Sequence, residues 1–366
     1  MKVLLLLYTV SLLVLLRQVH SKQHILNDIS TNNQQLRQTH VEPLDPEIFS
    51  NLYTYAHLID ISYCISNLGG IEKPFKCDLN CESRFPNMTL IYQWYFDDSV
   101  AGYIATTHDN IFRYNETTGG NKSKKKKTII ISLRGTKSFS DTYADLKINM
   151  INYSNLGLNL KLCGSECKVH KGFYEFYTRT LNVINQYVIN ELKGLEQDVC
   201  KSPREEEDYE LIILGHSLGG SVALLLGLHY LDMGYDKLTL VTMGQPLLGN
   251  YEFVNWVDEA MSSSEPPKHN DFKRKFLRVI HKNDIITTLP KNQYSIDKYY
   301  QFNNQIYLNC SASNTRPSLD QVVDCIDGDN DLCIAKDYPY DILDRHNYLQ
   351  IHLTYFRRIG FCGIRI

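Results

Sequence analysis

The chain has 366 residues, of which 43% are hydrophobic and 22% charged, and its formal net charge at pH 7 is −3. This length and composition suit one large α/β domain or two small ones with a substantial core. Because the balance is slightly acidic, the chain lacks the strong basic field that recruits nucleic acid, and we expect no nucleic-acid partner.

The first 21 residues have the pattern of a secretory signal peptide. Lys2 is followed by an apolar run over residues 3–16, Arg17 ends that run, and Val19 and Ser21 suit cleavage after Ser21. An uncleaved N-terminal anchor is the alternative, but a run of fourteen residues is too short to span a bilayer comfortably. The sequence therefore predicts a secreted, extracellular protein without a transmembrane anchor.

Residues 22–45 are polar and lack apolar periodicity, so they are predicted to form a loosely held N-terminal extension. Residues 48–65 then carry apolar groups at helical spacing. Residues 102–114 and 128–135 predict a strand pair. The polar segment between these strands contains Lys124–Lys127 beside two glycosylation signals, which is typical of a solvated hairpin tip rather than of a nucleic-acid site.

Helical and strand patterns alternate along the rest of the chain. Residues 170–195 predict an amphipathic helix, and a polar loop follows at residues 200–208. Three apolar, β-rich runs then alternate with helical or loop stretches: residues 209–215, 237–244 and 275–281. This alternation argues for a mainly parallel sheet covered by helices on both faces. No repeat or second composition regime appears, so residues 46–366 predict a single domain.

Cysteines and glycosylation signals agree with export. The ten cysteines are an even number, which in an oxidising compartment indicates disulfides. The pairs Cys77/Cys81 and Cys163/Cys167 lack the spacing and the histidine partners of a zinc site, and the acidic segment 324–333 lacks the distal glutamate of a calcium-binding EF-hand loop. Five N-x-S/T sequons are candidate glycosylation sites: Asn87, Asn115, Asn121, Asn152 and Asn309.

The pattern G-x-S-x-G occurs at residues 215–219. An apolar strand leads into it and a wholly apolar helix leads out, which is the strand–turn–helix frame of a nucleophile elbow. Such a turn strains Ser217, and the flanking glycines remove side chains that would collide there. A serine in an ordinary glycine turn is the alternative, but the frame on both sides favours Ser217 as a nucleophile at a helix N-terminus, where the helix dipole favours negative charge.

A serine nucleophile needs a histidine base, and the base needs an acid to orient it. In folds with such an elbow the three residues follow the order serine, acid, histidine along the chain. The acid should directly follow a strand, which selects Asp284 rather than Asp297 or Asp320 in later polar loops. Beyond the third strand only His346 and His352 remain as candidate bases, and this argument alone does not choose between them.

Acyl transfer also needs two donors aimed at the developing oxyanion. We expect one of them to be the backbone N–H of Leu218, the residue after the nucleophile. The other should come from a loop that ends an early strand, where Gly135 and Thr136 are found. Thr136 can offer its hydroxyl as well as its backbone N–H.

Six short motifs run through the chain in the order SLRGTKS, VHKGFYEFY, ILGHSLGG, MGQPLLGN, HKNDIITTLP and HLTYF. In this order and rough spacing, over about residues 46–366, the sequence resembles the fungal class 3 lipases. The segments YCI, KPFKCDLNC, NWVD and FCGI are similar to the secreted triacylglycerol lipases of yeasts. The resemblance implies a disulfide-stabilised α/β-hydrolase fold, a Ser/Asp/His triad, and hydrolysis of acylglycerol esters at an oil–water interface. We expect no cofactor and no metal.

The resemblance also implies roles for particular residues. In the family the catalytic histidine begins an H-L-x-Y-F block, which here starts at His352, whereas His346 matches only an H-x-Y fragment. The threonine after Arg-Gly is the family's oxyanion residue, which here is Thr136. The segment from about Lys137 to Leu146 corresponds to a lid, in which three apolar residues stand at helical spacing: Phe139, Tyr143 and Leu146.

The same analogy implies four cysteine pairs: Cys64–Cys362, Cys77–Cys81, Cys163–Cys167 and Cys325–Cys333. Cys200 and Cys310 have no counterpart in the family, and the even total favours a fifth bridge between them.

Two alternatives to a secreted lipase remain open. An extracellular esterase of the feruloyl or short-chain type would use the same scaffold, and the lid sequence, which has few aliphatic residues, does not decide between the two. A catalytically silent hydrolase fold acting as a binding protein is the other alternative, although it would not require Ser217, Asp284 and His352 together.

Overall fold

The computed structural model describes residues 41–97, 99–112, 126–137, 148–194, 208–263, 275–292, 297–303, 305–325, 328, 333 and 345–362. The predicted signal peptide, the first 19 residues of the predicted extension and the predicted lid residues Phe139, Tyr143 and Leu146 lie outside the described residues, as do Asn115, Asn121 and Cys200.

Within the described residues, nine strands form one sheet in the spatial order β1-β11-β10-β9-β8-β7-β4-β3-β2. Their bounds in chain order are β1 (Val41–Pro43), β2 (Thr89–Tyr95), β3 (Ala101–Thr107), β4 (Lys127–Arg134), β7 (Tyr209–His216), β8 (Leu238–Met243), β9 (Phe276–His281), β10 (Gln305–Leu308) and β11 (Val322–Cys325). The five strands from β4 to β10 in this sheet are parallel, and antiparallel strands lie on either side of them. The predicted mainly parallel sheet is therefore confirmed.

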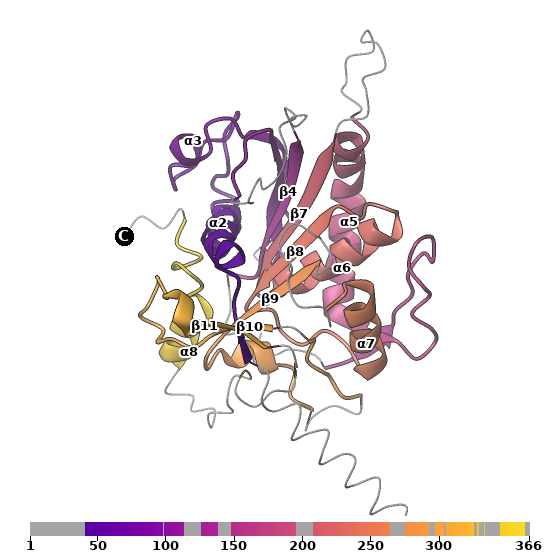
Figure 1. Cartoon of the computed structure of the whole chain (residues 1–366). Helices are drawn as coiled ribbons and strands as arrows, with labels where there is room; N and C mark the ends of the chain where they lie inside the picture. The colour runs from indigo at the N-terminus through magenta and orange to yellow at the C-terminus, as the bar shows by residue number, and fades with distance from the viewer. Residues whose placement is uncertain are drawn as a thin grey trace, which may run out of the picture.

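Helices cover both faces of the sheet (Figure 1). Helix α2 (Pro46–Ser62) lies on one face, and α5 (Lys171–Leu192), α6 (Leu218–Asp232) and α7 (Tyr251–Ala260) lie on the other. The short elements are α3 (Cys81–Arg84), β5 (Met150–Asn152), β6 (Lys168–His170), the 3-10 helices η1 (Ile285–Thr288) and η3 (Leu319–Gln321), and α8 (Arg345–His352).

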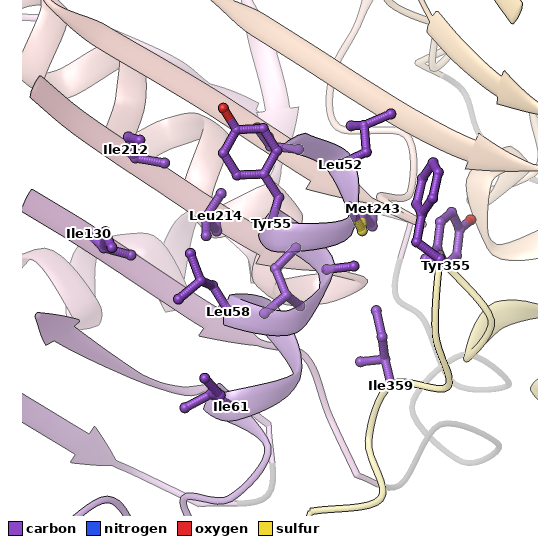
Figure 2. Packing of buried hydrophobic residues seen from close by; sticks show 14 of the residues in the cluster. Leu52, Tyr55, Leu58, Ile61, Ile130, Ile212, Leu214, Met243, Tyr355 and Ile359 are labelled. Atoms are coloured by element: carbon purple, nitrogen blue, oxygen red, sulfur yellow. The ribbon is translucent and has the colours of Figure 1, made fainter. Parts of the chain in front are cut away.

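The central strands are apolar on both sides because each side packs on helices. Along β7, Ile212 and Leu214 belong to the cluster that includes the buried face of α2, while Leu211 and Ile213 belong to the cluster formed with α5, α6 and α7. Figure 2 shows Leu58 and Ile61 of α2 among the residues of the first cluster. This double burial explains why the sequence there is a continuous apolar run rather than an alternating one.

The last residues of the segment predicted to be a loose extension, from Val41 onward, belong to the fold. Residues Val41–Pro43 form β1 and pair antiparallel with β11, and the Asp45 side chain accepts the backbone N–H of Glu47 and so caps the start of α2. Among the described residues, no helix is long and apolar enough to cross a membrane.

Four disulfides join described residues: Cys64–Cys362, Cys77–Cys81, Cys163–Cys167 and Cys325–Cys333. These are the pairs that the resemblance implied. The Cys64–Cys362 bridge joins positions 298 residues apart and fastens the segment after α8 to the end of α2.

The expected bridge between Cys200 and Cys310 is wrong, because Cys310 is a free thiol. Its side chain is buried in the cluster on the α2 face, and its Sγ lies 3.5 Å from His281 Nε2. Burial raises the pKa of this thiol, so we expect it to be an inert core cysteine.

Candidate active site

Ser217 occupies a sharp turn between β7 and α6. Its backbone has φ +58° and ψ −131°, a conformation that a residue with a side chain rarely adopts. A Cβ at Gly215 would lie 2.3 Å from the backbone oxygen of Gly219, so the turn closes only because position 215 is glycine. The strand–turn–helix geometry expected of a nucleophile elbow is present, with Ser217 at its apex.

His352 lies between Ser217 and Asp284. Its Nε2 is 2.8 Å from Ser217 Oγ, and its Nδ1 is 2.9 Å from Asp284 Oδ2 and 3.1 Å from Oδ1. A carboxylate only accepts, so Nδ1 carries the proton and, in a neutral ring, Nε2 is free to accept the serine proton. These three residues come from the elbow, the end of α8 and the loop after β9.

The three side chains are closed to solvent, with exposed fractions of 0% for Ser217, 1% for Asp284 and 2% for His352. Burial alone would raise the pKa of Asp284, but the charge on His352 and hydrogen bonds from His352 and Tyr355 outweigh it and lower that pKa. Asp284 is therefore a carboxylate at neutral pH, ready to stabilise a protonated His352.

Tyr355 supports Asp284 and was not singled out by the sequence analysis. Its hydroxyl donates to Asp284 Oδ2 at 2.5 Å and accepts the backbone N–H of His281 at 3.1 Å. The backbone N–H of Ile286 donates to the other carboxylate oxygen at 3.1 Å. Tyr355 and Asp284 lie 71 residues apart, so no local sequence pattern links them. The one signal in the sequence that could have pointed to Tyr355 was its place as the tyrosine of the H-L-x-Y-F block.

The loop that carries Asp284 is also held by Arg278, whose side chain is fully buried. Its guanidinium donates to the backbone oxygen of Gln245 at 2.9 Å and to that of Thr287 at 3.3 Å. Burial lowers the pKa of Arg278 to about 10, so it still carries a positive charge at neutral pH. Its two hydrogen bonds join the loop after β8 to η1, which directly follows Asp284.

The predicted oxyanion residues lie on two chain segments that meet at Ser217. A Cβ at Gly135 would stand 2.8 Å from Ser217 Cβ and 3.1 Å from the backbone nitrogen of Leu218. Thr136 follows and is buried. Arg134, which the sequence analysis did not single out, donates to the backbone oxygens of Gly135 (2.8 Å) and Ile65 (3.4 Å) and so fixes the end of β4.

Other predicted residues are separate from this cluster. His346 lies in the first turn of α8, six residues before His352, which corresponds to about 9 Å along a helix axis; its side chain is outside the described part of the chain. The sequon residues Asn87, Asn152 and Asn309 are exposed, as a glycosylation acceptor must be.

Gly244 makes room for the His352–Asp284 pair. It has φ +63°, and a Cβ there would lie 3.0 Å from His352 Cε1 and 3.1 Å from Asp284 Oδ2. We expect Gly244→Ala to displace the pair and to lower kcat by about 10²-fold, as misplacements of about 1 Å do in enzymes.

Gly194→Ala is the matched control, because Gly194 has φ +62° and a Cβ there would meet nothing within 4 Å. Both variants should lose about 1–2 kcal/mol of unfolding free energy through the left-handed backbone. Thermal unfolding and turnover of a soluble ester separate the two effects. Equal activity of the two variants would contradict a role for the space beside His352.

The sequence is similar to those of known proteins. The sequence matches the family described as Lipase (class 3) over residues 130–294. It is 30% identical over 303 residues to "Secreted mono- and diacylglycerol lipase 2" of Gibberella zeae, which covers 78% of this chain and 68% of that protein. It is 29% identical over 311 residues to "Lipase A" of Sodiomyces alcalophilus, covering 81% of this chain and 70% of that protein.

Solved structures show the same fold. The structure is similar to the crystal structure of Lip2 lipase from Yarrowia lipolytica, with a TM-score of 0.69, 29% identity, and coverage of 89% of this chain and 99% of that chain. Lipase II from Rhizopus niveus gives a TM-score of 0.61 at 22% identity, covering 88% of this chain and 99% of that chain.

Proposed function

Because the chain belongs to the class 3 lipase family, we propose that it is a secreted serine lipase that hydrolyses acylglycerol esters through Ser217, Asp284 and His352. The observation that carries the proposal is the position of His352, within hydrogen-bond distance of both Ser217 Oγ and Asp284. Secretion is supported by relatives whose names describe secreted lipases and by the signal-peptide pattern of residues 1–21.

Ser217 Oγ attacks the ester carbonyl carbon while His352 Nε2 takes the serine proton. The resulting oxyanion accepts hydrogen bonds from the backbone N–H of Leu218 and from Thr136. Collapse of this tetrahedral intermediate breaks the bond to the glycerol oxygen, which leaves with the proton from His352. The acyl group stays on Ser217 as an ester.

Water then repeats the sequence on the acyl-enzyme. His352 accepts a proton from the attacking water, a second tetrahedral intermediate forms, and its collapse releases the fatty acid as the proton returns to Ser217 Oγ. Asp284 keeps His352 in the required tautomer and stabilises it while it is charged. All steps are proton transfer and acyl transfer by side chains of this chain, so we assign no cofactor or metal.

We further propose that residues 137–146 act as a lid. The support is that Ser217, Asp284 and His352 are closed to solvent, so a covering segment must move before an ester reaches Ser217. If Phe139 and Tyr143 turn outward at an oil surface, the double variant Phe139→Ser/Tyr143→Ser should lower activity on a triolein emulsion by about tenfold or more, while activity on a soluble butyrate ester changes much less.

Leu158→Ser is the matched control for the lid variant, because it removes an apolar side chain that is 68% exposed and lies outside residues 137–146. It should leave both activities near those of the native protein. Equal losses on emulsion and soluble substrate in the lid variant would argue that residues 137–146 are not a lid.

The function itself is tested by comparing tributyrin with triolein, below and above the solubility limit of tributyrin. A lipase gains activity when the substrate forms a second phase and accepts the long-chain ester. Activity confined to dissolved short-chain or feruloyl esters would indicate an extracellular esterase, and no hydrolysis of any ester would indicate a binding protein.

A further inference from the structure

His216 is a fully buried residue at the variable position of the G-x-S-x-G turn, directly before Ser217. Its Nδ1 lies 2.6 Å from the Tyr63 hydroxyl, and its Nε2 lies 2.9 Å from the backbone oxygen of His352. One imidazole ring therefore joins three segments that are distant in sequence: the end of α2, the elbow and the end of α8.

The partners define the protonation of His216. A backbone carbonyl only accepts, so Nε2 carries the proton and donates to His352. Nδ1 is then the acceptor for the Tyr63 hydroxyl. Burial and, next, the charge on the nearby His352 lower the pKa of His216 to about 3, so the ring is neutral at the pH where a serine hydrolase works.

The same region of α2 holds the chain that follows His352. Arg357 Nε lies 2.8 Å from Asp60 Oδ2, and the backbone N–H of Gly360 donates to Asp60 Oδ1 at 2.9 Å. The Cys64–Cys362 disulfide closes the segment. Contacts with the end of α2 thus hold the segment that follows His352. The backbone of His352 itself is held by His216, the residue directly before the nucleophile.

We propose that His216, oriented by Tyr63, is a positioning residue that holds the main chain of His352 at the distance from which its ring accepts the Ser217 proton. The proposal rests on the proposed function, because it assigns His352 as the base. The centroids of the His216 and His352 rings lie 4.7 Å apart, so the two rings also pack together. The proposed role depends instead on the N–H that His216 donates to the backbone carbonyl of His352.

Two isosteric replacements separate the donor from the packing. In His216→Gln the amide nitrogen reaches the position of Nε2, so the donor to His352 is kept. In His216→Asn the amide reaches only the position of Nδ1, so the bond with Tyr63 can form but the donor to His352 is lost. Both changes remove the ring, which makes them matched controls for each other.

The measurements are kcat and KM on p-nitrophenyl butyrate, with thermal unfolding to follow stability. His216→Asn should lower kcat by about 10²-fold at nearly unchanged KM, because His352 is displaced from Ser217. His216→Gln should stay within about threefold of the native kcat. Tyr63→Phe, which leaves the ring in place but removes the hydroxyl that fixes its tautomer, should lower kcat by about fivefold, the effect of one ordinary hydrogen bond.

Equal kcat losses in the Gln and Asn variants, or native kcat in both, would overturn the positioning role. If His216→Asn does not fold, Tyr63→Phe decides: native kcat with lowered stability would mean that the Tyr63–His216 pair is only structural. An inactive native protein would overturn the proposed function together with this inference, whereas an active native protein with indistinguishable variants would overturn the inference alone.

Discussion

His352→Ala should lower kcat on a soluble short-chain ester by about 10⁴- to 10⁶-fold, as loss of a triad member does in other serine hydrolases. The reason is that His352 is the residue in contact with both Ser217 Oγ and Asp284, at 2.8 and 2.9 Å. Without it no base takes the proton of Ser217 at neutral pH, and no protonated imidazole is present to protonate the leaving alcohol.

His346→Ala is the matched control, because it removes a second histidine from the same helix α8. Two positions six residues apart on a helix cannot both meet Ser217 Oγ, so this variant should keep turnover within a modest factor of the native value. Adding Ser217→Ala to His352→Ala should cost almost nothing more, since the two residues act as one unit. An inactive His346→Ala beside an active His352→Ala would place the base at His346, six residues earlier in the chain.

Asp284→Asn should lower kcat by about 10⁴-fold while leaving the fold intact, the effect of the same change in another serine triad. An amide at this position can donate to His352 Nδ1, which puts the imidazole proton on Nε2 and blocks acceptance from Ser217. Asparagine has nearly the shape and volume of aspartate, so much of the local packing survives.

Asp297→Asn is the control for charge, because Asp297 was the next acid along the chain and pairs with Lys168 at the surface at a distance of 3.0 Å. A surface pair of this kind contributes little to stability, so the variant should keep native turnover. Full activity of Asp284→Asn, or loss of activity in Asp297→Asn, would show that the acid has been misassigned.

The features that could be predicted from the sequence are those that depend on residues close together along the chain. The apolar run before Gly215 and the apolar helix after it predicted β7, the elbow and α6, because both faces of a central strand must be buried. Asp284 was found because it directly follows a strand, and the structure brings it next to His352. The choice of His352 over His346 needed the resemblance, since position along the chain left both open.

What the sequence could not predict are contacts between residues far apart along the chain. Tyr63 and His216 meet across 153 residues, and no local pattern links an N-terminal tyrosine to the elbow. Gly244 belonged to a motif, but its purpose emerges only when His352 and Asp284 are seen beside it. The cysteine count suggested a fifth bridge, yet counting cannot position Cys310, whose thiol packs beside His281.

The central claim is that Ser217 is a nucleophile activated by its neighbours. It is tested most directly by treating the protein with a p-nitrophenyl alkyl phosphonate and locating the adduct by peptide mass spectrometry. The proposed mechanism predicts one adduct per chain, on Ser217, formed in proportion to the loss of ester hydrolysis and absent from His352→Ala. An adduct on a different residue, or full ester hydrolysis by Ser217→Ala, would contradict it.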